Sequence, residues 1–523
     1  MDRPRRPRLA GAFFLIDRRP PQVAPSRDPL IPPVMRVLLV LLTAAAVPAA
    51  MAQDLGETSF PNSGAAAAQG PFLQGLLLLH SFEYDDARDA FREAQAADPG
   101  FAMAAWGEAM THNHPVWMRQ DTEAGRAALA SADRDGITDR ERAYLDAAAV
   151  LFGDGPKDDR DDAYAEAMRL LAEAYPDDLD ARAFYALALL GTAHEGRDFA
   201  TYMRAAAILE DVFARNPEHP GAAHYLIHAY DDPVHAPLGL RPARAYAEIA
   251  PAASHALHMP SHIHLALGMW DEVAEMNDRS YHAALANSER RGGGLNGHGW
   301  HALAWWTYAE LQRDNVAEAQ RLLAIGIGHQ RSNPTGIGNA YLVSMRGQIA
   351  TDLSGPRAPD LDPFDNASPT VRMRDAYARA LEAGQTQTGR AHAGTFYAAY
   401  AEKTDPTPME RAAEFALRGM QLLDTDYEGA LELLRQAAEL EQASPLTFGP
   451  PEFAVPPTEA YGSALAGAGR FDAAVEAFRQ SLARAPGRTS SLRLLWLVAK
   501  RDGDLTTAAD AERQLQANGV GLD

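Results

Sequence analysis

The chain contains no cysteine. This absence excludes disulfide bonds, c-type haem attachment and metal sites built from thiolates. Any bound metal must therefore be held by His, carboxylate, Met or backbone groups. Acidic residues also outnumber basic ones, and the formal net charge is -22 at pH 7. Because like charges repel, this balance argues against nucleic acid or an anionic membrane surface as the main partner.

Long apolar runs are missing except for one near the N-terminus, where the sequence reads MRVLLVLLTAAAVPAAMAQ from Met35. Arg36 supplies a positive n-region, Val37 to Val47 an apolar h-region, and Ala50 to Ala52 a small-residue cleavage site. This run is too short to span a bilayer stably. We therefore expect a cleaved signal peptide over 35–52, a misassigned upstream extension over 1–34, no membrane span in the mature chain, and a periplasmic or secreted location.

The rest of the sequence has almost no alternating β-branched runs, so strands are not expected. It is instead rich in Ala, Leu, Glu and Arg, and its apolar residues recur at helical spacing. Turn signals follow stretches of ordinary helix length, at Asp98-Pro99-Gly100, Tyr175-Pro176-Asp177, Asn216-Pro217 and Ala485-Pro486-Gly487. This pattern predicts an all-α chain of helix pairs in series.

One spacing of small, small, aromatic, small and proline residues occurs near both ends of the mature chain. It is carried by Gly75, Ala87, Phe91, Ala94 and Pro99, and again by Gly462, Ala474, Phe478, Ser481 and Pro486. The spacing resembles the tetratricopeptide repeat (TPR), in which small residues let two antiparallel helices approach and the aromatic ring fills the gap. A generic Ala-rich bundle would not reproduce it twice. The resemblance implies an all-α, TPR-type solenoid of helical hairpins, wound as a right-handed superhelix.

A Pro- and Asp-rich stretch, SGPRAPDLDPFDNASP, interrupts the helical pattern from Ser354 to Pro369. We expect a loop over 354–370 that separates an N-terminal TPR-like array (53–353) from a C-terminal one (371–523). Repeats stack through their neighbours, so this loop can equally be an insertion within one solenoid.

Histidine is concentrated in one part of the chain. Of the 17 histidines, eleven lie between His219 and His301. When the sequence is divided into repeats, five of these histidines fall on the first helices of three successive repeats. First helices line the concave groove of TPR arrays. His224 and His228 lie one turn apart on the first of these helices. His262 lies on the second, and His298 and His301 on the third, while two flanking loops carry His235, His255 and His258.

This arrangement predicts a metal site that lies in a His-rich groove and is built from residues of successive repeats. Neutral imidazoles with an aspartate as a further ligand suit zinc, copper or iron. The candidate ligands are His224, His228, Asp231, Asp232, His235, His258, His262, His298 and His301. The alternative is a hydrogen-bonded lining that caps helices and binds a peptide or an acidic group. We expect the other histidines of this region, His219, His264 and His282, to serve surface or packing roles.

The stretch HYLIH has the two-His spacing of the zincin motif HExxH, but it lacks the general base. Tyr225 stands in the place of the catalytic Glu, and His235 comes eleven rather than ten residues after His224. Asp231 or Asp232 remains available as a base for a metal-bound water. A metal site alone does not specify chemistry, so a binding protein is favoured over an enzyme.

The His-bearing blocks also resemble a family of His-rich exported bacterial TPR proteins. The resemblance covers roughly residues 70–515 and is most specific in THNHPVW (Thr111–Trp117) and in HYLIHAYDDPVH (His224–His235). It implies the fold and export but no reaction. We therefore expect an exported solenoid that binds a peptide or protein partner in its concave groove and carries a His-based metal site. The alternative is a metal-dependent hydrolase or oxidase that uses the same His and Asp residues.

Overall fold

The computed structural model describes residues 54–352, 358–361 and 367–522. The expected upstream extension, signal peptide and part of the 354–370 loop lie outside these residues. Within them the chain is almost entirely helical, and the strands are β1 (Asn113–His114) and β2 (Arg119–Gln120), which pair antiparallel on either side of the 3-10 turn Pro115–Trp117. None of the helices described is both long and apolar enough to cross a membrane.

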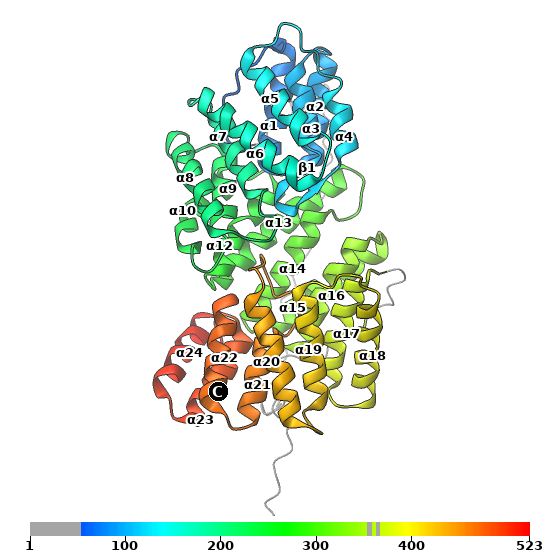
Figure 1. Ribbon diagram of the computed structural model, residues 1–523, viewed down its shortest axis with the longest axis vertical. Helices are drawn as coiled ribbons and strands as arrows, with labels where there is room; N and C mark the ends of the chain where they lie inside the picture. The colour runs from blue at the N-terminus through cyan, green and yellow to red at the C-terminus, as the bar shows by residue number, and fades with distance from the viewer. Residues whose placement is uncertain (1–53, 353–357, 362–366, 523) are drawn as a thin grey trace, which may run out of the picture.

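The helices follow one another with short connections (Figure 1). The first part of the chain contains α1 Ala66–His80, α2 Tyr84–Ala97, α3 Ala102–Met110, α4 Thr122–Leu129, α5 Asp139–Leu151, α6 Lys157–Ala174, α7 Leu179–Leu190, α8 Phe199–Arg215, α9 Pro220–Tyr230, α10 Ala236–Ile249, α11 Ser254–His258, α12 Pro260–Ala266 and α13 Trp270–Arg290. The second part contains α14 Gly297–Gln312, α15 Val316–Ser332, α16 Gly336–Thr351, α17 Pro369–Ala383, α18 Gln387–Ala401, α19 Pro408–Leu422, α20 Tyr427–Ala443, α21 Pro457–Gly467, α22 Phe471–Arg484, α23 Thr489–Asp502 and α24 Leu505–Ala517.

Neighbouring helices pack as hairpins, for example α1 with α2, α13 with α14, and α19 with α20. The first helices of successive hairpins also contact one another, as α1 does with α3, α7 with α9, and α19 with α21. This two-layer stacking is the arrangement of helical-repeat proteins. The fold is an all-α, TPR-type helical-hairpin solenoid, which confirms the prediction of the fold class.

The repeat spacing read from the sequence corresponds to close helix packing around one aromatic ring. Phe91 of α2 is fully buried and lies against two glycines, Gly75 on α1 and Gly107 on α3. A Cβ atom on Gly107 would lie 2.3 Å from Cε1 of Phe91, and one on Gly75 would lie 2.9 Å from the same ring. Phe478 meets Gly462 in the same way at the other end of the chain. The small residues are therefore needed for the approach of the helices.

Replacing Gly107 by alanine is expected to lower the free energy of unfolding by about 1 to 3 kcal/mol, because the added methyl group overpacks the buried Phe91 ring. Denaturant unfolding measures this change. Gly70 of α1 is the matched control, since a Cβ atom there would meet nothing within 4 Å. Gly70→Ala is expected to stabilise the protein by about 0.5 to 1 kcal/mol. Equal effects of the two changes would contradict a packing role for Gly107.

The solenoid curves enough to bring distant repeats into contact. Helix α1 touches α9, and the segment before α1 runs back along the same repeats, where Glu57 N donates to Glu218 O at 2.9 Å. Helix α23 returns to α14. There Thr489 N donates to Oε1 of Gln312 at 2.9 Å, and the indole N–H of Trp270 donates to Gly487 O at 3.1 Å. Side chains far apart in the sequence are thereby enclosed together.

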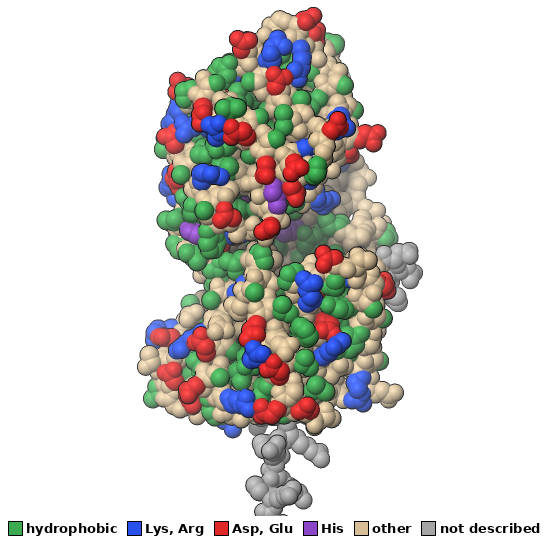
Figure 2. Space-filling model, in the orientation of Figure 1, with side chains coloured by type: hydrophobic (Ala, Val, Ile, Leu, Met, Phe, Trp, Pro, Cys, Tyr) green, Lys and Arg blue, Asp and Glu red, His purple; other side chains and the backbone are tan. Residues whose placement is uncertain are grey.

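Three large hydrophobic clusters form the core. The first joins buried side chains between Leu55 and Ala266, the second between Trp270 and Ala358, and the third between Met373 and Ala511. Figure 1 shows α1 to α13 in the upper part of the molecule and α14 to α24 in the lower part. On the face shown in Figure 2, acidic and basic side chains are mixed, and the molecule is narrower between its upper and lower parts.

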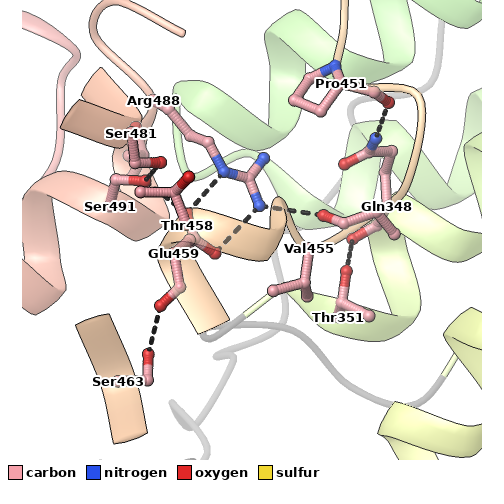
Figure 3. A network of polar contacts seen from close by, with 12 residues as sticks. Gln348, Thr351, Pro451, Val455, Thr458, Glu459, Ser463, Ser481, Arg488 and Ser491 are labelled. Carbon is pink, nitrogen blue, oxygen red and sulfur yellow. Dashed lines mark hydrogen bonds and ion pairs between the residues drawn. The ribbon is translucent and has the colours of Figure 1, made fainter. Parts of the chain in front are cut away.

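A buried polar network lies where the lower part returns to α14 (Figure 3). The guanidinium of Arg488 donates to Oε2 of Glu459 on α21 at 2.8 Å and to the carbonyl of Ala454 at 3.0 Å. The Ser491 hydroxyl donates to the same Glu459 carboxylate. Thr489, which contacts Gln312, follows Arg488 directly. The ion pair therefore fixes the segment through which the C-terminal repeats return to α14.

Candidate metal centre

The clustered histidines meet in two triads. In the first, His224 and His228 of α9 lie beside His255 of α11. The Nε2 atom of His224 is 3.1 Å from Nε2 of His228 and 3.2 Å from Nε2 of His255. All three side chains are buried. The four-residue spacing on α9 places the first two rings on one face of the helix, and the third comes from the next repeat.

The second triad adjoins the first and contains His258 of α11, His262 of α12 and His301 of α14. The Nε2 atoms of His258 and His262 are 3.0 Å apart. One nitrogen from each ring lies within 4.8 Å of the others. The triad thus draws its ligand atoms from three helices, two of which meet at Met259 and Pro260.

Helix α11 supplies one imidazole to each triad, so its position decides the geometry of both. It is held by Glu83, whose buried carboxylate accepts the His255 backbone N–H at 3.0 Å and the Ser254 hydroxyl at 2.7 Å. Glu83 lies in the first repeat, directly before α2. A carboxylate that accepts hydrogen bonds from the free N–H groups at the start of a helix stabilises that end of the helix. The first repeat therefore fixes the helix that joins the two triads.

The outward nitrogens of four of these rings have hydrogen-bond partners. The Nδ1–H of His224 donates to the carbonyl of His80 at 2.7 Å, and that of His262 donates to Oδ2 of Asp231 at 2.6 Å. The Nδ1 atoms of the other two rings contact side-chain oxygens at 2.7 Å, namely Asn277 Oδ1 for His258 and the Tyr341 hydroxyl for His301. Metal-binding imidazoles are held in this way, with the outer nitrogen bonded and the inner one free to ligate.

The second triad brings two hydrogen-bond acceptors together. The Nδ2 group of Asn277 donates to Val273 O at 2.7 Å, which directs its Oδ1 to His258. His258 therefore carries its proton on Nδ1, and His262 does the same because it faces the Asp231 carboxylate. When both rings are neutral, their two Nε2 atoms present lone pairs to each other at 3.0 Å and no proton lies between them. A cation between them makes this approach favourable.

Burial favours the neutral form of His224, His258 and His301. Desolvation lowers the pKa of His224 and of His301 to about 3. Desolvation and the neighbouring His301 and His262 hold the pKa of His258 well below its usual value. Neutral imidazole is the form that ligates a metal.

Four of the residues predicted as ligands lie outside the triads. Asp231 reaches the outward nitrogen of His262 rather than the facing Nε2 atoms. Asp232 pairs with Arg197 at 3.1 Å and with Nδ1 of His235 at 2.9 Å, and His235 belongs to that pair. The ring of His298 lies 4.9 Å from that of His255. The other five predicted ligands, His224, His228, His258, His262 and His301, lie in the two triads.

Two features were not predicted from the sequence. His255 was expected in a loop before Pro260, but the short helix α11 places its ring in the first triad. Its three-residue spacing from His258 was the available signal. The second feature is a third group in which Asp180 contacts His80 at 2.8 Å and His219 at 3.5 Å. Although burial alone would raise the pKa of Asp180, the neighbouring imidazoles of His219 and His80 hold it well below its usual value.

The third group is part of the core packing. His80 is fully buried, and a Cβ atom on Gly221 would lie 2.3 Å from its Nδ1 atom. The remaining hydrogen-bonding capacity of Asp180 is used by the Thr58 hydroxyl, which donates to Oδ2 at 2.8 Å. Because His80 also presents its carbonyl to His224, the group fixes α1 against the helix that carries the first triad.

Both triads open onto a cavity of about 700 Å³. Its wall includes His228 and His255 of the first triad, and His262 and His301 of the second. The other lining side chains are mainly aromatic or charged, namely Phe82, Tyr84, Trp117, Tyr341, Phe448, Glu83, Asp85, Asp86, Arg88, Arg119 and Arg291. The cavity is therefore large enough for a small molecule or a peptide side chain to reach these four histidines.

Comparison with known proteins identifies no family for the chain. No family model matches it, and no curated protein matches it. Solved structures with some likeness include a chain of the APC/C hetero-tetramer Cut9-Hcn1, with 11% identity, 88% of this chain and 75% of that chain covered, and a TM-score of 0.35. The human IFIT1 dimer with PPP-AAAA shows 13% identity over 86% of this chain and 90% of that chain, with a TM-score of 0.34.

Proposed function

We propose that this protein binds a transition metal through the two His triads. The observation that carries the proposal is the 3.0 Å approach of the Nε2 atoms of His258 and His262, whose outward nitrogens both donate elsewhere. When both rings are neutral, a lining held only by hydrogen bonds does not account for two facing acceptors. Imidazole nitrogens bind zinc at about 2.0 to 2.1 Å, so two ligands of one ion lie at such separations. Zinc, copper and iron all accept this ligand type.

We further propose that the protein is exported and that its cavity receives a peptide or protein segment. TPR-type solenoids present extended concave surfaces that bind such segments. The aromatic and charged side chains that line the cavity suit a peptide with apolar and charged groups. Export rests on the signal-peptide pattern at 35–52 and on the resemblance to exported TPR proteins.

A metal-dependent enzyme is the second candidate, and the exposure of the triads to the cavity favours it. Three protein ligands leave coordination positions for water or substrate, as in catalytic zinc sites. The carboxylate next to the second triad, Asp231, is occupied by His262.

Metal analysis of the mature chain from Gln53, purified without a His-tag, tests the proposal. We expect at least about one equivalent of transition metal per chain, and we expect a chelator to lower the melting temperature, because a ligand that binds only the folded state stabilises it. Less than about a tenth of an equivalent, even after reconstitution with zinc, copper and iron in turn, would overturn both the metal site and the enzyme alternative.

A further inference from the structure

We propose that the two triads form one dinuclear centre and that its metal is copper. This inference rests on the proposed metal-binding function and extends it to the number and kind of ions.

The two triads lie in contact. The ring centroids of His228 and His262, which belong to different triads, are 5.9 Å apart, and those of His255 and His258 are 6.1 Å apart. Within a triad, the rings of His224 and His228 are 4.9 Å apart. Other rings that share a triad are further apart, since those of His228 and His255 are separated by 6.4 Å. The separations between the triads therefore lie within the range found inside them. Ions bound at the two triads would be immediate neighbours.

The ligand set carries no charge. All six triad members are imidazoles, and Asp231 is the carboxylate that contacts one of them, through the outward nitrogen of His262. Two neighbouring divalent ions would place four positive charges in a buried site with little compensation, which is costly at low dielectric. Copper can bind as a singly charged ion, so two copper ions halve that charge.

The chemistry of the donors also favours copper. Among divalent first-row metals, nitrogen sites generally bind copper most tightly. Iron sites with open positions in proteins typically include a carboxylate ligand beside two His, and none of the triad members is a carboxylate. Structural zinc sites are usually closed by four protein ligands, whereas each triad offers three and faces the cavity, so a zinc ion here would be of the catalytic type.

Copper titration with electron paramagnetic resonance tests the inference. The mature chain is loaded with copper alone and held under a mild oxidant, so that the bound copper is Cu(II), and bound metal and Cu(II) spins are counted on the same sample. We expect two copper ions per chain and a spin signal well below two, because neighbouring Cu(II) ions couple magnetically. The variants His224→Ala and His301→Ala each damage one triad, and we expect each to keep one copper with a full signal of one spin. His282→Ala on the exposed side of α13 is the matched control and should behave like the wild type.

The possible outcomes separate this inference from the proposed function. Two copper ions with two full, uncoupled spins would overturn the dinuclear centre, and so would a single bound metal per chain. Two zinc ions that equimolar copper fails to displace would overturn the choice of copper. In each of these cases the metal-binding function stands. The absence of every metal after reconstitution would overturn both.

Discussion

Replacing His258 and His262 together by alanine is expected to remove the metal from the second triad. The change deletes two of its three ligands and the pair of facing Nε2 atoms. A ligand present at a thousand times its dissociation constant stabilises the folded state by about 4 kcal/mol. The variant should therefore lose the part of the stabilisation that metal at the second triad gives the wild type. Elemental analysis and thermal unfolding with and without metal measure the two effects.

Two further variants show whether the loss has the expected cause. His282→Ala removes an exposed imidazole from α13 and should leave the metal content unchanged. Asp231→Asn keeps the ligands but weakens the hydrogen bond that orients His262. Loss of such an outer partner typically lowers metal affinity by about 10- to 100-fold, so this variant should bind weakly rather than not at all. Full metal content in the double alanine variant, with its helical circular dichroism intact, would show that these residues are not the ligands.

The fold was predictable because repeat packing depends on local spacing. Phe91 needs small residues at fixed separations along the chain, and the sequence displays Gly75, Ala87 and Ala94 at those separations. The closure of the solenoid was not predictable in this way. The contact of α1 with α9 and that of α23 with α14 result from small rotations added over several repeats. The total rotation cannot be predicted from any single segment of the sequence.

The same difference explains which parts of the site could be predicted. His224 and His228 share a helix face, and their spacing alone places them together. His255 was placed in a loop because the sequence does not reveal that Glu83, far away in the first repeat, holds the start of α11. Asp231 was predicted as a ligand because its residue type suits metal. Which nitrogen of His262 it meets depends on how α9 and α12 pack, which is a tertiary property.

Replacing Arg488 by alanine is expected to destabilise the protein by about 3 to 5 kcal/mol, because Glu459 would then be a buried carboxylate without its positive partner. Both side chains are almost fully buried, with exposed fractions of 3% for Arg488 and 4% for Glu459. Arg488 also donates to the carbonyl of Ala454, so a second acceptor would lose its donor (Figure 3). Denaturant unfolding measures the loss, and the C-terminal repeats should become the first part of the chain to lose amide protection.

The double variant Arg488→Met with Glu459→Met separates the cost of an unpaired charge from that of lost contacts. Removing both charges leaves no uncompensated carboxylate, so we expect this variant to be more stable than Arg488→Ala. It should still fall below the wild type, because the Ser491 hydroxyl and the Ala454 carbonyl lose their partners, at about 1 to 3 kcal/mol for each buried group. If Arg488→Ala were no less stable than the double variant, the buried charge of Glu459 would not be what Arg488 compensates. The contact of the C-terminal repeats with α14 would then depend mainly on neighbouring interactions such as that of Thr489 with Gln312.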